Sequence, residues 1–273
     1  MTRSRGLGDV YKRQGQYQGD EVAVKRISLI GMTASGRAKV LKAFSTELAI
    51  MVKLRSPRIV QVFGVVTTDT SYLGLVVEMC AGGALREALE ADDYATAVDE
   101  AQRRRWLLDV ALGMSYLYSK GVEHRDLKTL NVLLDASRRR CKVSDFGLSQ
   151  SESLNTAATQ STMGRGGGAK GTPAYMAPEL LDSNTFTEET DVYAYALVIW
   201  EVLTGDIPWR GLNPVQVAMQ ILTKQARPAV PEGAPADLAG LMVRCWAHEP
   251  GARPKFAAIK AELLGGGPET PAK

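Results

Sequence analysis

HRDLKTLN, residues 124–131, and DFG, residues 145–147, are the two stretches of this sequence that decide its fold. The first stretch is charged and polar, and short β-prone segments follow it at 132–134 and 142–143. A histidine, an arginine and an aspartate in a row can also form a structural salt bridge at a turn, so the first stretch alone is a weak indication of function. Its interpretation therefore depends on the motifs around it.

Further motifs lie on both sides of these stretches. Upstream, the apolar strand Val22-Ala23-Val24 ends at Lys25, and Glu47 lies in an amphipathic helix predicted over residues 37–54. Residues 15–30 are predicted to form a small hairpin with its turn near Gly19 and Asp20. Downstream come an apolar helix predicted over 191–203 with a stop at Gly205, and the motif residues Ala177-Pro178-Glu179, Asp191 and Arg253. Chance does not bring so many motifs together in one order.

In this order the motifs resemble those of the eukaryotic protein kinase catalytic domain. The resemblance covers residues 15–262 and is strongest to the serine/threonine type within the tyrosine-kinase-like group, which includes Raf-like and mixed-lineage kinases. The group assignment rests on stretches such as Asp191-Val192-Tyr193, Ile199-Trp200-Glu201 and Cys245-Trp246. The resemblance implies a bilobal α+β fold, with a small, mainly antiparallel β lobe (15–80) and a larger helical lobe (81–262).

The resemblance also implies which residues carry out phosphoryl transfer. Lys25 would contact the ATP phosphates and be held by an ion pair with Glu47. Asp126 would accept or orient the proton of the substrate hydroxyl, and Lys128 would neutralise charge on the γ-phosphate. Thr172 would bond to both of these residues. Lys128 and Thr172 favour a serine or threonine acceptor.

Binding residues for Mg²⁺ and ATP follow from the same resemblance. Asn131 and Asp145 would hold Mg²⁺, which prefers hard oxygen ligands. Adenine needs backbone donors and acceptors in an apolar slot, for which the resemblance implies Ala23, Val77, Glu78, Cys80 and Leu133.

Two architectural contacts are implied as well. Asp191 would cap the backbone of the catalytic loop. Arg253 would pair with Glu179 beneath the substrate platform.

The amino-terminal residues depart from the family pattern. Gly6-Leu7-Gly8 looks like the start of a Gly-rich loop, but the third glycine is absent and Val10 lies two residues too far from Lys25. Residues 1–14 resemble translated adapter sequence and are predicted to be a non-native leader, so that the first strand and the Gly-rich loop of the family would be missing. Residues 263–273 are predicted to be a disordered tail.

Composition limits the class of protein. The chain is 45% apolar and 23% charged, which is typical of a folded domain. Its net charge of +3, spread over 33 basic and 30 acidic side chains, argues against nucleic-acid binding, and the run Arg138-Arg139-Arg140 is interpreted as a solvated turn. Three widely spaced cysteines and the lack of a long apolar run or signal peptide predict a cytoplasmic protein without a membrane segment.

The expected partners are a protein substrate and ATP. An upstream kinase is a further expected partner, acting on the Ser-, Thr- and Gly-rich loop 149–172. Three alternatives stay open: a dual-specificity or tyrosine kinase, a pseudokinase that serves as a scaffold, and a small-molecule phosphotransferase.

Overall fold

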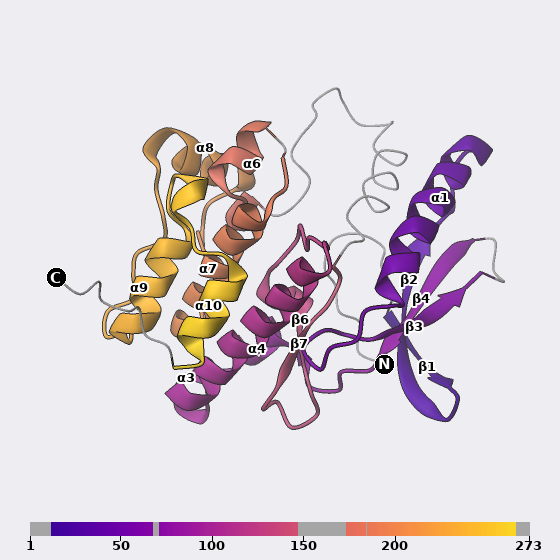
Figure 1. Ribbon diagram of the computed structural model, residues 1–273, viewed down its shortest axis with the longest axis horizontal. Helices are drawn as coiled ribbons and strands as arrows, with labels where there is room; N and C mark the ends of the chain where they lie inside the picture. Colours follow the sequence, from indigo (N-terminus) through magenta and orange to yellow (C-terminus); the bar gives the residue numbers. More distant parts are fainter. Residues whose placement is uncertain (1–11, 68–70, 147–172, 184, 266–273) are drawn as a thin grey trace. The chain divides into compact units, whose positions relative to one another are not determined.

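The computed structural model describes residues 12–67, 71–146, 173–183 and 185–265 (Figure 1). These residues form two compact units. The first unit contains residues 12–55 and 60–79, and the second contains residues 56–59 and the described residues from Cys80 onward. Within these ranges no helix is both long and apolar enough to cross a membrane.

The first unit contains a four-stranded antiparallel sheet in the order β1-β2-β4-β3. Its strands are β1 (Lys12–Tyr17), β2 (Asp20–Ser28), β3 (Val62–Val66) and β4 (Tyr72–Glu78). The turn between β1 and β2 lies at Gln18 and Gly19, both with positive φ, which suits the twist of a tight hairpin and confirms the predicted position of the turn.

β1 begins earlier than the predicted hairpin. Residues 12–14, which were assigned to the leader, pair with 23–25 of β2. The hydrogen bonds between paired strands join main-chain groups and do not depend on a pattern of side chains. The sequence of residues 12–14 therefore did not predict that they pair.

One helix, α1 (Ala34–Met51), accompanies this sheet and carries Glu47. It begins three residues before the predicted start because the side chain of Thr33 caps it, accepting a hydrogen bond from the Gly36 N–H at 3.1 Å. Val40, Phe44 and Met51 are buried, as the apolar periodicity predicted, whereas Leu41, predicted on the same face, is 40% exposed.

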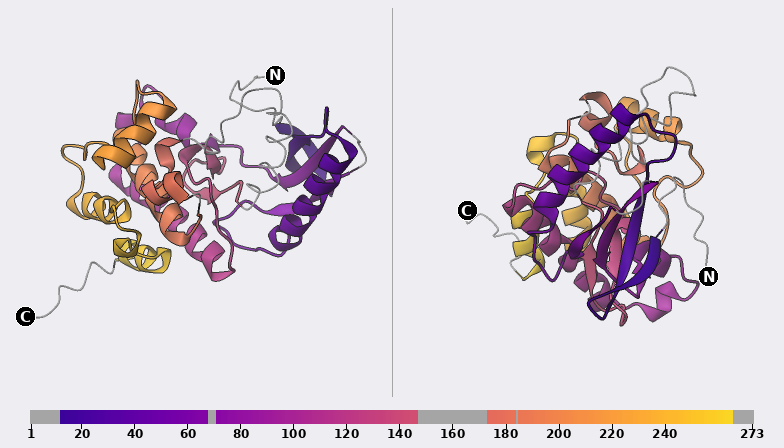
Figure 2. Two further views of the ribbon diagram at one scale, coloured as in Figure 1. Left: turned by 90° about the horizontal axis from the view of Figure 1, so that it is seen from above. Right: turned by 90° about the vertical axis from the view of Figure 1, so that its right-hand side faces the viewer.

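The second unit is mainly helical. A small antiparallel sheet, β5 (Gly83–Ala84), β6 (Val132–Leu134) and β7 (Cys141–Val143), lies among its helices. The helices are α2 (Leu85–Leu89), α3 (Tyr94–Ala97), α4 (Glu100–Ser119), α6 (Pro178–Ser183), α7 (Glu188–Thr204), α8 (Pro214–Lys224), α9 (Ala236–Cys245) and α10 (Phe256–Leu263). In Figure 2 the indigo and violet strands belong to the first unit and the orange and yellow helices to the second.

The core of the second unit is built around α7. Tyr193 and Tyr195 of this helix are fully buried, α9 packs against α7, and α10 packs against α4. α7 ends where predicted, since Gly205 adopts a left-handed conformation (φ 72°) and its N–H bonds to the Glu201 carbonyl. An antiparallel sheet with one helix, followed by a larger helical part, confirms the predicted α+β class.

Candidate active site

The loop that follows α4 is held by a buried carboxylate. Asp191, in the first turn of α7, accepts hydrogen bonds from the backbone N–H groups of His124 (2.8 Å) and Arg125 (2.9 Å). It also accepts one from the Tyr118 hydroxyl at 2.6 Å. Arg125 has a φ of 69°, a strained value for this residue type that the two bonds help to maintain. The expectation that Asp191 caps this loop is confirmed.

The environment of Asp191 acts on its pKa in two directions. Burial raises the pKa of Asp191 above its usual value, and the hydrogen bonds from Tyr118 and from the loop backbone oppose this shift only in part. The donors around the carboxylate therefore offset part of the cost of its removal from water.

The same loop brings Asp126, Lys128 and Asn131 together. The Asn131 amide nitrogen donates to the Asp126 carbonyl at 2.7 Å and to its carboxylate at 2.9 Å. The Lys128 ammonium lies 2.7 Å from the nearer carboxylate oxygen of Asp126. The Asp126 side chain is 37% exposed, so a hydroxyl group in solvent can approach it. A proton acceptor, a cation and an amide thus share one accessible position.

Asn131 and Asp145 are connected through one residue. Ser144 donates from its backbone N–H (2.8 Å) and its hydroxyl (2.9 Å) to the Asn131 carbonyl. Asp145 follows directly, with a φ of 60°, and Phe146 after it is buried. These bonds place the two predicted Mg²⁺ ligands on neighbouring segments of the second unit.

The oxygen atoms of Asn131 and Asp145 fit a Mg²⁺ ion that would also be bound by a substrate. In the described part of the chain, no group of three or more His, Cys, Asp or Glu side chains is arranged to hold a metal ion. An amide oxygen from Asn131 and a carboxylate from Asp145 are hard donors, but too few to fill an octahedral shell. Phosphate oxygens and water would complete it.

A second buried carboxylate was not predicted from the sequence as part of the site. Glu201 of α7 is fully buried and accepts from the Thr129 hydroxyl (2.6 Å), the Tyr175 hydroxyl (2.8 Å) and the Arg86 guanidinium (2.7 Å). Burial raises the pKa of Glu201, and its three donors oppose that shift. The signal was available, because a charged residue within an otherwise apolar helix requires a partner.

Other predicted residues lie in the first unit. Lys25 on β2 is 7% exposed, and Glu47 on α1 is half-buried. Ala23 on β2 is directly opposite Val77 on β4, so their side chains share one face of the sheet. Glu78, at the end of β4, accepts a hydrogen bond from the Gln61 N–H at 3.2 Å.

Two further predicted residues, Cys80 and Leu133, belong to the second unit. Leu133 is in β6, opposite Ala84 of β5. Both Cys80 and Leu133 are half-buried. Gly147, Thr172 and the loop 149–172 lie outside the described residues.

The predicted pair of Arg253 and Glu179 is confirmed. The Arg253 guanidinium makes two parallel bonds to the Glu179 carboxylate, at 2.6 and 2.9 Å, and donates to the carbonyls of Ala247, His248 and Glu189. Its side chain is 0% exposed, and its bonds join α6 to the first turn of α7 and to the segment that follows α9.

Comparison with known proteins gives consistent matches. Residues 6–263 match the family model described as protein tyrosine and serine/threonine kinase. A probable serine/threonine-protein kinase of Dictyostelium discoideum is 37% identical over 253 residues, which is 93% of this chain and 26% of the relative. Two Arabidopsis thaliana proteins are each 36% identical: the serine/threonine/tyrosine-protein kinase HT1, over 92% of this chain and 61% of its own, and the serine/threonine-protein kinase CTR1, over 93% and 29%.

These matches confirm the resemblance noted in the sequence, including the tyrosine-kinase-like group. The family match begins at residue 6, inside the 1–14 stretch, whose non-native origin stays a prediction. The chain spans only 26% to 61% of the lengths of these relatives. With its motifs, its fold and these matches in agreement, the chain belongs to the protein tyrosine and serine/threonine kinase family.

Proposed function

We propose that this domain transfers the γ-phosphoryl group of ATP to serine or threonine hydroxyl groups of proteins, in cytoplasmic signalling. The observation that carries the proposal is the cluster of Asp126, Lys128 and Asn131, where an accessible carboxylate lies 2.7 Å from an ammonium group. The family membership and the names of the relatives support a protein acceptor.

Asp126 receives or orients the proton of the acceptor hydroxyl. Its carboxylate is held by Asn131, so it keeps one orientation as the hydroxyl attacks. Lys128 supplies positive charge next to it, where the transferred group gains negative charge on its equatorial oxygens. Thr172, outside the described residues, is proposed to bond to both side chains.

Asn131 and Asp145 would hold Mg²⁺, which would supply positive charge to the phosphates. The bonds from Ser144 to Asn131 keep the two ligands on connected segments. In the first unit, Lys25 is proposed to contact the α- and β-phosphates and to pair with Glu47. Following the resemblance, Ala23, Val77 and Leu133 are proposed as side chains that contact adenine, and the backbone of Glu78 and Cys80 as its hydrogen-bonding groups.

The test measures Mg²⁺-dependent transfer of labelled γ-phosphate to a generic protein substrate. Asp126→Asn keeps the shape of the side chain but cannot accept a proton, so we expect turnover to fall by about 100-fold or more. Asp182→Asn, at an exposed position of α6, is the matched control and should retain the activity of the unchanged chain.

A version with a complete Gly-rich loop in place of residues 1–14 distinguishes two causes of low kinase activity: the lack of that loop, and a domain that is not a kinase. If that version binds ATP and transfers no phosphate, the domain is a scaffold and the proposal is wrong.

A second candidate is a dual-specificity kinase. It is favoured by the relative HT1, which is named a serine/threonine/tyrosine-protein kinase. Phosphoamino-acid analysis of a phosphorylated peptide library distinguishes the two, because phosphotyrosine appears only if the acceptor is not limited to serine and threonine.

A further inference from the structure

Glu123 and Arg125 form an ion pair in the loop that carries Asp126. The Arg125 guanidinium donates from Nε to the Glu123 carboxylate at 2.9 Å, and the side chains of Arg125 and Glu123 are 26% and 33% exposed. In the ranges that the structure describes, this is the one ion pair of Arg125. The motif noted in the sequence begins at His124, so it gives Glu123 no role.

Arg125 is held at three points. Its backbone N–H donates to Asp191 at 2.9 Å, its guanidinium is paired with Glu123, and its guanidinium carbon lies 5.5 Å from the centroid of the Phe186 ring. A cation over an aromatic face is attracted by the ring. Asp191 lies in the first turn of α7 and Phe186 just before that helix. Two of the three contacts therefore come from the start of α7, and Glu123 supplies the third from within the loop.

These contacts matter because the backbone of Arg125 is left-handed, with a φ of 69°. A residue with a side chain is strained in this region and stays there only when the contacts around it hold it. The backbone angles of Arg125 also set the direction in which the chain continues to Asp126. The contact with Glu123 therefore bears on the position of the Asp126 carboxylate.

The charges around Arg125 are balanced as well. Burial, and then the negative charges of Asp191 and Glu123, raise the pKa of the Tyr118 hydroxyl. Two carboxylates thus lie near one hydroxyl group, and like charges at short distance repel each other. Arg125 bonds to both carboxylates, so its positive charge offsets this repulsion.

An ion pair with this much exposure adds little to stability by itself. The rate of a reaction depends more steeply on geometry, because a small displacement of a reacting group is costly. Stability and turnover therefore distinguish two roles for Glu123. Loss of a merely structural pair would leave kcat unchanged, whereas loss of a pair that positions Asp126 would lower kcat.

We propose that Glu123 is a positioning residue of the transfer reaction, which holds Arg125 in its left-handed conformation and thereby keeps Asp126 directed at the acceptor hydroxyl. This rests on the proposed function, because Asp126 has to receive or orient the acceptor proton. Glu123 acts through Arg125 and not through contact with the substrate. The negative partner of Arg125 comes from the same loop, so no phosphate group added to the chain is needed to hold it.

The test measures steady-state transfer of labelled phosphate by the full chain after phosphatase treatment, so that no phosphate group replaces the Glu123 carboxylate. The version with a complete Gly-rich loop is used throughout if the chain itself does not turn over. Glu123→Gln should lower kcat by about tenfold and change KM for ATP by less than about twofold. The midpoint of thermal unfolding should fall by less than about 4 °C. Glu123→Asp, which keeps the charge, should recover part of the loss in kcat.

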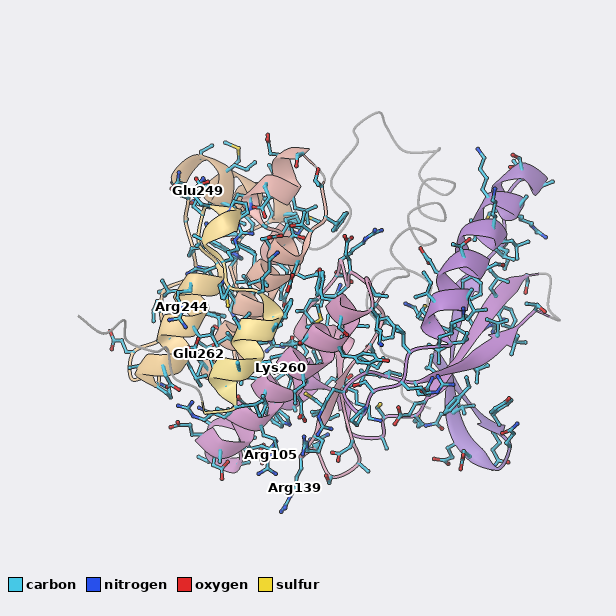
Figure 3. The ribbon with its side chains drawn as sticks, in the orientation of Figure 1. Arg105, Arg139, Arg244, Glu249, Lys260 and Glu262 are labelled. Carbon is cyan, nitrogen blue, oxygen red and sulfur yellow. The ribbon has the colours of Figure 1, made fainter. Side chains whose placement is uncertain are left out.

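Glu262→Gln is the matched control. Glu262 of α10 binds Arg244 of α9 at 2.6 and 2.7 Å, and Figure 3 shows this pair on its two helices. The side chains of Arg244 and Glu262 are 43% and 20% exposed, so the control removes the same charge from a pair of similar exposure. Its kcat should equal that of the unchanged chain.

Two further measurements show whether Glu123 acts through the loop. In a double-mutant cycle, Glu123→Gln should lower kcat no further once Arg125→Met has removed the guanidinium. Hydrogen exchange of the backbone amides of His124 and Arg125 is independent of turnover. It should be several-fold faster in Glu123→Gln than in the unchanged chain and in the control.

The proposal is wrong if Glu123→Gln keeps the kcat of the unchanged chain, whether or not its unfolding midpoint falls. It is also wrong if the effects of Glu123→Gln and Arg125→Met add fully, or if exchange of the two amides does not change. If no version of the chain transfers phosphate, the proposed function is wrong, and the role of Glu123 in transfer is refuted with it. Faster exchange in Glu123→Gln would then show a contact that holds the loop without a role in turnover.

Discussion

Replacement of Arg86 by leucine tests the structure at a buried ion pair. The Arg86 side chain is 6% exposed and its guanidinium lies 2.7 Å from the Glu201 carboxylate, which is fully buried. It also donates to the carbonyls of Gly205 and Asp206. Arg86→Leu leaves a carboxylate in the core with only hydroxyl donors. Breaking a buried pair in this way costs about 3–5 kcal/mol, from a total stability of about 5–15 kcal/mol. The midpoint of thermal unfolding should fall by roughly 6–20 °C.

The stability lost in Arg86→Leu should depend on pH. The direction of this dependence is set by protonation of the Glu201 carboxyl. Burial raises the pKa of Glu201, and removal of the Arg86 charge raises it further. A carboxyl whose pKa is higher in the folded than in the unfolded state favours the protonated form on folding. Its contribution to stability is therefore fully present below the unfolded pKa and is lost as the pH rises through the folded pKa. Arg86→Leu should be less harmful at about pH 5 than at about pH 8.

Urea unfolding followed by circular dichroism across this pH range measures the effect. The double variant Arg86→Leu with Glu201→Leu removes both charges and should recover much of the loss, since an apolar pair can replace a buried ion pair. Arg210→Leu, which removes an exposed arginine paired with Asp206, should leave the urea midpoint nearly unchanged. The reasoning fails if the loss is the same at every pH and the double variant is no more stable than the single one.

Three further predictions concern other contacts of the second unit. Asp191→Asn should lower kcat by about 10- to 100-fold with little change in KM for ATP, because it removes the charge that binds the loop backbone. Steady-state kinetics measure both constants, and a change in KM alone would contradict the prediction. Arg253→Ala should lower the free energy of unfolding in urea by about 2–4 kcal/mol. Arg253→Lys should recover only part of that free energy, since lysine cannot make two parallel hydrogen bonds to Glu179. Full recovery by lysine would contradict a role for the two parallel bonds. Gly113→Ala should be destabilising by about 1–3 kcal/mol despite the higher helix propensity of alanine, because a Cβ there would lie 2.6 Å from the Arg58 carbonyl oxygen. A higher melting temperature of the variant in calorimetry would contradict this, because it would mean that the backbone at Arg58 moves away without cost.

Contacts that depend on short segments were the ones the sequence predicted. The loop of Asp126, Lys128 and Asn131 spans a few residues, so its motif fixes its geometry closely, and its carboxylate cap Asp191 came with the same motif set. The helix-ending role of Gly205 likewise needs only local information.

Contacts between distant segments gave much weaker signals. Arg86 and Glu201 are 115 positions apart, and neither periodicity nor spacing pairs them. The sequence states only that a glutamate inside an apolar helix needs a donor, not which donor it has. The ion pair of Arg140 was not predicted for the same reason, because its partner Asp109 lies on another element, 31 positions away.

The two buried carboxylates of α7 together explain how the catalytic loop keeps its position. Asp191, near the start of the helix, binds the loop backbone at His124 and Arg125, and Glu201, near its end, binds the hydroxyl of Thr129. The loop that carries Asp126 is thus attached on both sides to the helix at the core of the unit. Arg125, whose φ of 69° lies in the left-handed region, keeps this conformation because the hydrogen bonds around it hold the backbone in place. Loosening either carboxylate should therefore lower turnover although neither touches the substrate, and the effect should appear in kcat, because it moves the proton acceptor and leaves the side chains proposed to bind ATP in place.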